Sequence, residues 1–505
     1  MASLVVRAKL LKTLRHVTAR PLCSSSSSSS SSSTATAFSA VSSFNLAPTV
    51  VGNTTATATI RTSGAGCGVV DLDDPERLFA SVSTSKLLRA SANLRMAAAD
   101  PMVDLGLWMM KSRLLEVEAV KDVVLAVIKR TFYDHFCAGE DAAEVGKSVL
   151  RLREAGLRAM LDYALELVDD SEACDRNLTE FLRTVESAKS LPPSSVSYIV
   201  AKITALCPMR LLERVSDLLR WQHKDPSFSL PWKLKTFPIF SDSSPTYHTH
   251  TEPEPLTPEE ERDLQLSHER IQKLTQNCLE ANLPLMVDAE HTSIQPAVDY
   301  LTYSSAIMYN KDDNPIVYGT LQAYLKDAKE RLLLVKKAAD KMGVPMGFKL
   351  VRGAYMSTER ELASSLGYES PVHNTIQDTH SSYNDCASFM IERVANGDSS
   401  AVVLATHNVD SGKMAAAKAH DFGIGKLNHK LEFAQLYGMA DSLSFGLSNA
   451  GFQVSKYMPF GPVDMVMPYL LRRAEENRGM LSSSTLDREL MWKELKRRLK
   501  AAILI

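Results

Sequence analysis

The sequence lacks long apolar runs, closely spaced cysteine pairs and an excess of charge of either sign. Its 505 residues include 57 Lys and Arg against 59 Asp and Glu, a net charge of −2. This balance excludes the basic footprint of a nucleic-acid-binding protein. The longest apolar runs, such as 123–128, are far shorter than the roughly 20 residues that cross a bilayer, so we expect no membrane-spanning helix. The seven cysteines have no C-x-x-C spacing, which indicates a reducing compartment and no structural zinc.

Acidic residues are absent from the first 70 positions, which differ in composition from the rest of the chain. The basic residues there are Arg7, Lys9, Lys12, Arg15, Arg20 and Arg61. Apolar residues at helical spacing lie between the first of these, and a serine run follows at 24–33. A basic, amphipathic, serine-rich leader is typical of a transit peptide, and its repeated arginines favour the mitochondrion over the plastid. We therefore expect residues 1–70 to be a disordered transit peptide, with a merely disordered tail as the alternative.

The rest of the chain divides into two patterns. Residues 71–195 carry apolar residues three and four positions apart, notably over 160–168, which predicts a helical arm. Residues 196–480 alternate short β-branched apolar runs with helical stretches. The predicted strands are Tyr198–Leu206, Leu285–Ala289, Ile316–Ala323, Gly347–Tyr355, Ala401–Thr406, Leu431–Leu436, Ser442–Leu447 and Gln453–Phe460. This α/β pattern predicts a closed (βα)8 TIM-like barrel, with the helical arm before it and a C-terminal helix over the barrel mouth. An open doubly wound sheet is the alternative.

Two further segments stand outside the barrel pattern. Residues 225–258 are rich in Pro, Thr, Ser and His, which predicts a surface insertion. Two histidines and two glutamates alternate over 248–254, but a Pro-rich loop does not supply the fixed scaffold of a metal site, so we expect none. Residues 481–505 form an amphipathic tail with basic residues before an apolar end. We expect either a frayed solvated helix or a peripheral contact with an anionic membrane surface.

Polar residues close most of the predicted strands. The carboxyl ends of the strands form the functional face of a (βα)8 barrel, so these residues are candidates for a site. They are Lys202, Thr204, Asp288, Glu290, His291, Gln322, Lys349, Arg352, Thr406, His407, Asn408, Glu432, Gln435 and Tyr457. Each alone is compatible with a solvated strand end. Because burying an unpaired charge costs several kcal/mol, the whole set indicates a ligand.

A second group of polar residues follows the last predicted strand. Tyr469, Arg472, Arg473 and Glu476 are spaced i, i+3, i+4 and i+7, so they share one face of a helix. A basic stripe alone is typical of a solvated surface. Two guanidinium groups beside a phenol ring also suit a small carboxylate on an apolar body, which they would hold while the ring covers its hydrocarbon.

Seven motifs in order resemble the proline dehydrogenase family, an FAD-dependent (βα)8 family. They are Lys202–Leu206, Asp288–Glu290, Gln322–Tyr324, Lys349–Tyr355, Ala405–Asn408, Gln435–Met439 and Tyr469–Asn477. The resemblance runs from about Leu150 to Gly479 and extends to the leader of the mitochondrial, plant-like members. It implies oxidation of L-proline to (S)-1-pyrroline-5-carboxylate, the first step of proline degradation to glutamate. The hydride would pass to FAD and the electrons to a membrane quinone, with the enzyme at the inner mitochondrial membrane on its matrix side.

The resemblance also implies roles for individual residues. It places Lys202, Arg472 and Arg473 on the proline carboxylate, with Asp288 orienting Lys202. The residues that would wall the proline ring are Tyr355, Leu436, Tyr457 and Tyr469. The residues that would hold FAD are Gln322, Lys349, Arg352, Gly353, Thr406, His407, Asn408, Gln435 and Glu476. Bacterial members carry Arg where Lys349 stands, which replaces a bidentate contact by a point charge. Glu166 aligns with a residue that gates the site in the family.

The sequence leaves three alternatives to proline oxidation. Hydroxyproline-oxidising members of the family tend to have a small residue at position 457, so Tyr457 favours proline. A barrel lyase would use Lys202 or Lys349 as a Schiff-base nucleophile. A scaffold that has lost its activity would not retain the whole polar set, given the cost of burying it.

Overall fold

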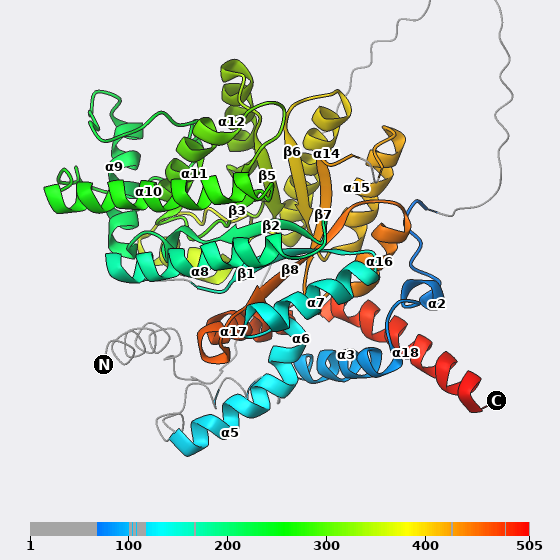
Figure 1. The fold of residues 1–505 in the computed structure, drawn as a ribbon. Coiled ribbons are helices and arrows are strands. Elements are labelled where there is room, and N and C mark those ends of the chain that lie inside the picture. The colour runs from blue at the N-terminus through cyan, green and yellow to red at the C-terminus, as the bar shows by residue number, and fades with distance from the viewer. Residues whose placement is uncertain are drawn as a thin grey trace, which may run out of the picture. The chain divides into compact units, whose positions relative to one another are not determined.

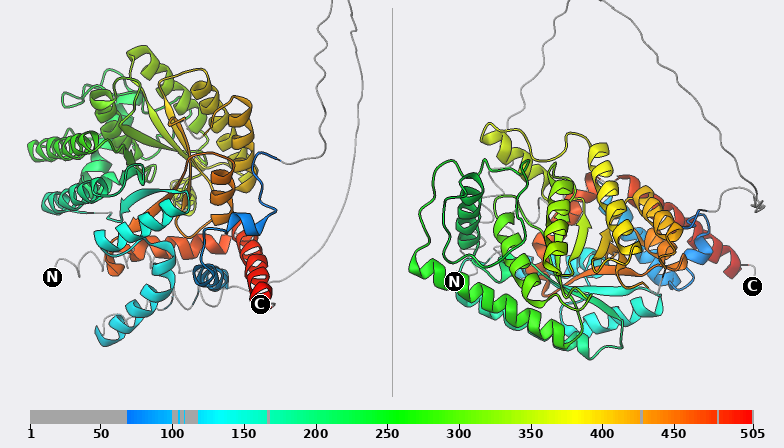
Figure 2. Two further views of the ribbon diagram at one scale, coloured as in Figure 1. Left: turned by 45° about the vertical axis from the view of Figure 1, so that its right-hand side comes forward. Right: turned by 90° about the horizontal axis from the view of Figure 1, so that it is seen from above.

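The computed structural model describes residues 68–99, 104, 108, 118–165, 168–425, 428–479 and 481–503, all within one compact unit from Cys67 onward. Nearly all of the predicted transit peptide lies outside these residues, and so does Glu166. Eight parallel strands close into a barrel in chain order, with helices around them (Figures 1 and 2). The predicted (βα)8 class is therefore confirmed. Among the described residues, no helix combines the length and the apolar character needed to cross a membrane.

The strands pair with their sequence neighbours, and the first pairs with the last. They are β1 (Arg158–Tyr163), β2 (Val196–Ala201), β3 (Leu285–Val287), β4 (Val317–Gln322), β5 (Gly347–Val351), β6 (Ala401–Ala405), β7 (Leu431–Leu436) and β8 (Val454–Phe460). The ring closes where Met160 of β1 lies opposite Tyr457 of β8 and Asp162 lies opposite Pro459. Because every pairing is parallel, all eight carboxyl ends lie at one mouth of the barrel.

The helices alternate with the strands. Between the strands lie α8 (Ser171–Lys189), α9 (Met209–Lys224), α10 (Pro258–Glu280), α11 (Gln295–Tyr309), α12 (Ala328–Met342), α13 (Met356–Ser365), α14 (Ile376–Ala395), α15 (Val409–Asp421) and α16 (Asp441–Asn449). After β8 come α17 (Val463–Gly479) and α18 (Leu481–Ile503). Before β1 come α2 (Pro75–Leu78), α3 (Thr84–Ala97), α5 (Glu118–Ile128), the π-helical turn η2 (Lys129–Tyr133), α6 (Asp134–Phe136) and α7 (Ala142–Glu154).

Two of the predicted elements are wrong. The segment 158–163, predicted as part of the helical arm, forms β1, and Ser442–Leu447, predicted as a strand, lies in α16. The middle residues of β1 are buried on both faces, so they lack the alternation that distinguishes a strand. Residues 442–447 are buried all around the helix, and a Cβ on Gly446 would lie 2.4 Å from Leu72 Cδ2. This close packing against the N-terminal segment explains an apolar pattern without a polar helix face.

Three packed regions support the barrel. The largest lies between the strands and the surrounding helices. A second fills the barrel itself with side chains such as Met160, Tyr198, Met286 and Tyr318. The third joins the helical arm to α17: Tyr133 and Phe136 pack with Val466, Tyr469 and Leu470, and the Tyr133 hydroxyl donates to the Gly461 carbonyl over 2.7 Å. The arm therefore holds the helix that carries the predicted arginines.

The insertion between α9 and α10 is firmly packed. The ring centroid of Trp232 lies 5.7 Å from that of Tyr300, and the Phe237 ring lies 5.8 Å from Tyr303, so the segment crosses α11. Its two histidines meet hydroxyl groups: His248 Nε2 lies 3.1 Å from Thr292 Oγ1, and His250 Nδ1 lies 3.4 Å from the hydroxyl oxygen of Tyr368. The insertion thus covers the outside of the barrel near the β3–α11 loop.

Candidate functional site

A largely buried carboxylate, with 13% of its side chain exposed, lies at the centre of the barrel mouth. Asp288 follows β3, and its carboxylate accepts hydrogen bonds from Lys349 Nζ on β5 and, over 2.8 Å, from the hydroxyl group of Tyr457 on β8. Lys202 Nζ, after β2, lies 3.6 Å from the same carboxylate. The Lys349 ammonium also lies 5.2 Å from the centre of the Tyr457 ring. Four residues predicted from separate strand ends therefore form one cluster, which we call the Asp288 cluster.

The charges of the Asp288 cluster depend on one another. Burial alone would raise the pKa of Asp288, but the ammonium groups of Lys349 and Lys202 outweigh it, and the pKa lies below its usual value. Burial raises the pKa of Tyr457 well above its usual value, and the carboxylates of Asp162 and Asp288 raise it further. Tyr457 therefore remains a phenol that donates, and Asp288 remains a carboxylate that accepts.

Asp162 is a member of this neighbourhood that the sequence analysis missed. It is the penultimate residue of β1, it is 2% exposed, and its charge acts on the Tyr457 hydroxyl group. The signal was present, because Asp162 ends a short apolar run as Asp288 does. It was overlooked because that run was assigned to a helix.

A second cluster surrounds Arg352 after β5. Arg352 Nη1 donates to Thr406 Oγ1 over 2.6 Å, Nη2 to Ser411 Oγ over 2.8 Å and Nε to His380 Nδ1 over 3.0 Å. Its guanidinium carbon lies 4.4 Å from the centre of the Tyr383 ring. All of these partners are neutral acceptors or an aromatic face, and Arg352 forms no ion pair with a carboxylate among the described residues.

The Arg352 cluster adjoins a helix N-terminus. Asn408 Oδ1 accepts from the Ser411 backbone N–H over 2.8 Å and so caps α15, and Thr406 Oγ1 accepts from the Asn408 N–H over 3.0 Å. Burial lowers the pKa of Arg352, which reflects the cost of holding this charge away from water. An uncompensated guanidinium group beside a helix N-terminus is suited to an anionic ligand group. Sequence reasoning found Arg352, Thr406 and Asn408 but missed Ser411.

His407 and Gln435 are engaged inside the protein. His407 Nε2 accepts the Leu436 backbone N–H over 3.1 Å, which requires a neutral ring with its proton on Nδ1. Burial lowers the pKa of His407 to about 3, with Lys456, Arg473 and Arg352 adding to the effect. Gln435 Nε2 donates to the Thr406 carbonyl over 3.3 Å, and its Oε1 accepts from Ser444. Gln435 therefore positions the end of β6.

Helix α17 brings the predicted arginine face to the same region. Tyr469 and Arg473 are 7% exposed, and the Arg473 guanidinium carbon lies 5.2 Å from the centre of the Tyr469 ring. Leu436 at the end of β7 packs in the same cluster as Tyr469. Arg472 is half-buried on α17. Glu476 lies on this helix, outside the residues whose side chains the structure describes.

Tyr355 and Gly353 shape the loop after β5. The Tyr355 ring centroid lies 4.0 Å from that of His291 after β3. Gly353 has φ of +132°, and a Cβ there would lie 2.1 Å from the Tyr324 ring. Only glycine fits this close approach of loop and ring.

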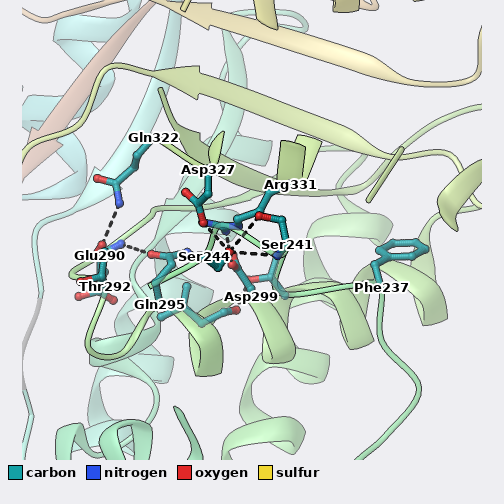
Figure 3. Close-up of polar contacts among 12 residues, drawn as sticks. Phe237, Ser241, Ser244, Glu290, Thr292, Gln295, Asp299, Gln322, Asp327 and Arg331 are labelled. Atoms are coloured by element: carbon teal, nitrogen blue, oxygen red, sulfur yellow. Dashed lines mark hydrogen bonds and ion pairs between the residues drawn. The ribbon is translucent and has the colours of Figure 1, made fainter. Parts of the chain in front are cut away.

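Glu290 joins three strand ends behind these clusters. Its carboxylate accepts from the Thr204 backbone N–H over 3.2 Å and from the Thr204 hydroxyl over 2.9 Å. Its carbonyl accepts from Gln322 Nε2 over 2.9 Å, and its N–H donates to Gln295 Oε1 over 2.6 Å (Figure 3). Gln322 therefore uses one of its two amide N–H groups in a contact within the protein. These hydrogen bonds connect the loop after β2, which begins with Lys202, to the loop after β3, which begins with Asp288.

This tie continues outward to the insertion. Gln295 Nε2 donates to Asp299 Oδ1 over 2.8 Å, and Arg331 Nη2 donates to Asp299 Oδ2 over 2.5 Å (Figure 3). Arg331 Nη1 lies 3.9 Å from Asp327 Oδ2, which in turn accepts from Ser244 Oγ of the insertion over 2.6 Å. A buried polar network therefore runs from the insertion to the barrel mouth.

Glu432 lies at the opposite end of the barrel. It forms an ion pair with Arg158 Nη1 over 3.2 Å and accepts from the Ser455 hydroxyl group. Arg158 is the first residue of β1, so this ion pair lies at the end of the barrel where the strands begin. Of the predicted strand-end residues, Glu432 is the one that does not reach the mouth.

The chain matches a known family over most of its length. A family model described as Proline dehydrogenase matches residues 145–485. Two proteins of Arabidopsis thaliana are similar to it: Proline dehydrogenase 2, mitochondrial, at 60% identity over 86% of this chain and 91% of the relative, and Proline dehydrogenase 1, mitochondrial, at 61% identity over 86% and 87%. The Hydroxyproline dehydrogenase of Bos taurus is 35% identical over 83% of this chain and 91% of that protein.

A solved structure shares the fold. The proline utilization A protein of Bdellovibrio bacteriovorus, inactivated by N-propargylglycine, superposes with a TM-score of 0.58 at 17% identity. The match covers 83% of this chain and 43% of that one, so the chain spans less than half the length of that protein. At this identity the likeness concerns the barrel and its surrounding helices alone.

Proposed function

The chain belongs to the proline dehydrogenase family, and from this premise we propose a complete reaction for it. Its activity is that of a proline dehydrogenase, and the family uses FAD. We propose that it oxidises L-proline to (S)-1-pyrroline-5-carboxylate as the first step towards glutamate, and that the electrons leave the flavin for a quinone. The observation that carries the proposal is the convergence of Lys202, Lys349 and Tyr457 on Asp288 at the strand ends.

The residues of the mouth fit FAD. Arg352, held by neutral partners beside the N-terminus of α15, offers a positive charge to the diphosphate. Gln322, Lys349, Gly353, Thr406, His407, Asn408, Gln435 and Glu476 would form the rest of the flavin site. Bound there, the flavin would accept the hydride from the ring carbon next to the proline nitrogen, while the nitrogen loses a proton and a C=N bond forms.

The chain's own residues would bind and orient the substrate. Arg472 and Arg473 would hold the carboxylate together with Lys202, since guanidinium groups pair with carboxylates bidentately. Tyr469, Tyr355 and Leu436 would cover the ring and exclude water. Asp288 and Tyr457 hold the two ammonium groups of the cluster in place. These ammonium groups would disfavour a protonated proline nitrogen nearby, which favours the neutral amine that can lose a hydride.

Product analysis tests this reaction. The purified chain without its leader, given L-proline and a soluble quinone analogue, should form a product two hydrogens lighter than proline by mass spectrometry. One equivalent of quinone should be reduced for each product formed. A product without quinone reduction, or borohydride trapping of substrate on a lysine, would point to the lyase alternative instead.

The substrate within the family follows from position 457. The Tyr457 hydroxyl donates to Asp288, which fixes the ring at the mouth, and the ring would fill the space that a hydroxyl on the substrate ring needs. We therefore propose proline over hydroxyproline as the substrate. Comparison of kcat/KM for the two imino acids decides this, and a preference for hydroxyproline would reverse the assignment.

The proposed location is the mitochondrial matrix side of the inner membrane. The Arabidopsis relatives are named as mitochondrial proteins, and the leader has the composition of a transit peptide. A quinone acceptor dissolved in lipid would require the enzyme to contact the membrane surface. Import of the leader fused to a reporter protein tests the location.

A further inference from the structure

Helix α18 presents one face to solvent beside α3. Figure 1 shows α18 running to the edge of the molecule with α3 next to it. The Arg95 guanidinium carbon of α3 lies 4.6 Å from the centre of the Trp492 ring, and Arg498 Nη1 donates to Thr84 Oγ1 over 3.2 Å. The two helices therefore contact each other at both ends of α3. The α18 outer face, as we call it, consists of Trp492, Lys493, Lys496, Leu499, Lys500 and Ile503, with Arg95 adjoining it.

The opposite face of α18 is fixed to the body. Leu490, Met491 and Leu495 are buried in the main core. Asp487 accepts from the backbone N–H groups of Asp441 and Ser442 over 2.9 and 3.0 Å, and so caps the start of α16. The outer face is therefore held in place by side chains on the opposite face of the helix.

The α18 outer face exposes three large apolar side chains to solvent. Trp492 is 40% exposed, Leu499 62% and Ile503 74%. Their spacing of seven and four residues puts them on one stripe of the helix. Exposed apolar side chains scattered singly are ordinary, but a stripe rimmed by charged residues marks an interaction surface.

The rim of this face is basic. Lys493, Lys496 and Lys500 are exposed, and no ion pair between described residues involves them. Arg497 and Arg498, by contrast, pair with the buried Glu494, and Arg497 also pairs with Glu76 of α2 over 3.1 Å. The described side chains of α18 include one exposed carboxylate, Glu489, and α3 contains no acidic residue at all. The positive charge is thus local, on a chain whose net charge is −2.

We propose that the α18 outer face docks on the surface of an anionic phospholipid bilayer. Trp492, Leu499 and Ile503 would enter the interface, and the lysines with Arg95 would meet the headgroups. The inference deepens the proposed function, on which it rests, because electrons bound for a quinone in lipid need the enzyme at that surface. Because the opposite face of α18 is buried against the body, the helix is ordered and is not the frayed solvated helix that the sequence also allowed.

Vesicle cosedimentation of the intact chain without its leader tests the proposal. The wild type should pellet with phosphatidylcholine vesicles that contain phosphatidylglycerol, and not with phosphatidylcholine alone. The variant Lys493→Glu/Lys496→Glu/Lys500→Glu should bind at least about 100-fold more weakly, because a basic residue near an anionic surface contributes about 1 kcal/mol. The variant Leu499→Ser/Ile503→Ser should bind at least about tenfold more weakly at every salt concentration.

A matched control has the same change of charge elsewhere. Lys273→Glu/Lys337→Glu/Lys341→Glu alters exposed lysines of α10 and α12 and should bind vesicles as the wild type does. Equal binding by the α18 and control variants would overturn the proposal. So would concentration-dependent dimers in sedimentation velocity that only the Leu499→Ser/Ile503→Ser change abolishes, since the face would then bind a second copy. Flavin reduction by L-proline in solution, measured on every variant, reports on the proposed function separately.

Discussion

Asp288 links the two ammonium groups and the phenol of the barrel mouth. Removing the Tyr457 hydroxyl takes one donor from this carboxylate, whereas removing the ring opens the space beside it. The two effects are separable because Phe keeps the ring and Ser does not. Tyr457 therefore has two separable roles. Its hydroxyl group positions Asp288, which Tyr457→Phe tests, and its ring fills space, which Tyr457→Ser tests.

Tyr457→Ser should lower kcat/KM for proline and raise the ratio of hydroxyproline to proline turnover. Tyr457→Phe should lower proline turnover by about 10- to 150-fold, since a hydrogen bond to a charged group is worth about 1.5–3 kcal/mol, without shifting that ratio. Steady-state kinetics with both imino acids measure this. An identical ratio in the Ser variant and the wild type would show that another residue limits the size of the pocket.

Arg472→Met and Arg473→Met should each cost about 2–5 kcal/mol of kcat/KM for proline, the usual loss when one member of a desolvated charge pair is removed. Flavin content should be unchanged, because the proposed role is towards the substrate. The flavin absorbance per chain serves as the control. Full activity in either variant would mean that the substituted arginine does not bind the substrate carboxylate.

At the level of elements, the buried polar network between the insertion and the barrel mouth depends on one carboxylate, that of Asp299. Asp299 receives both Gln295 and Arg331, and Arg331 is nearly buried. Burial raises the pKa of Asp299 to about 6, although Arg331 opposes this. Loss of this carboxylate would leave the buried guanidinium group with the more distant Asp327 as its remaining carboxylate partner among the described residues.

Asp299→Asn should therefore lower the free energy of unfolding by about 3 kcal/mol, as for a broken buried ion pair. Asp385→Asn, which removes the exposed partner of Lys329, is the matched control and should cost less than about 1 kcal/mol. Chemical denaturation measures both. Equal losses would show that the network adds no stability.

The strand ends were predictable because a polar residue after a buried apolar run is a local signal. It identified Lys202, Asp288 and Lys349, which the barrel then brings together. β1 was not found, because a strand buried on both faces has no alternation, and Asp162 was lost with it. The partners of Arg352 could not be derived either, since His380 and Ser411 come from α14 and α15 and meet only in the fold.

For the whole molecule, four buried or partly buried histidines contribute to the dependence of stability on acid. Burial lowers the pKa of His135 and His268 to about 4 and that of His248 and His407 to about 3, from 6.5. The unfolded chain takes up these protons at higher pH than the folded one, so stability falls as the pH drops below 6.5. Burial raises the pKa of Asp299 and Asp487 to about 6, which stabilises the fold as pH falls and offsets part of this loss.

The free energy of unfolding should therefore decrease between pH 6.5 and pH 4. Each histidine contributes at most about 1.4 kcal/mol per pH unit, and Asp299 and Asp487 oppose this. Urea denaturation across this range measures the slope. His268→Phe should make the slope shallower, because its ring takes up no proton in either state. A free energy that stays constant or rises towards pH 4 would contradict the assignment of these histidines as neutral.

The most direct test of the whole account is the visible spectrum of the purified chain without its leader, recorded anaerobically before and after addition of L-proline. FAD bound at the mouth should give flavin bands, and proline should bleach them, because in the proposed reaction the hydride would pass from substrate to flavin with no acceptor present. Flavin bands that proline leaves unchanged, or a colourless protein, would contradict it.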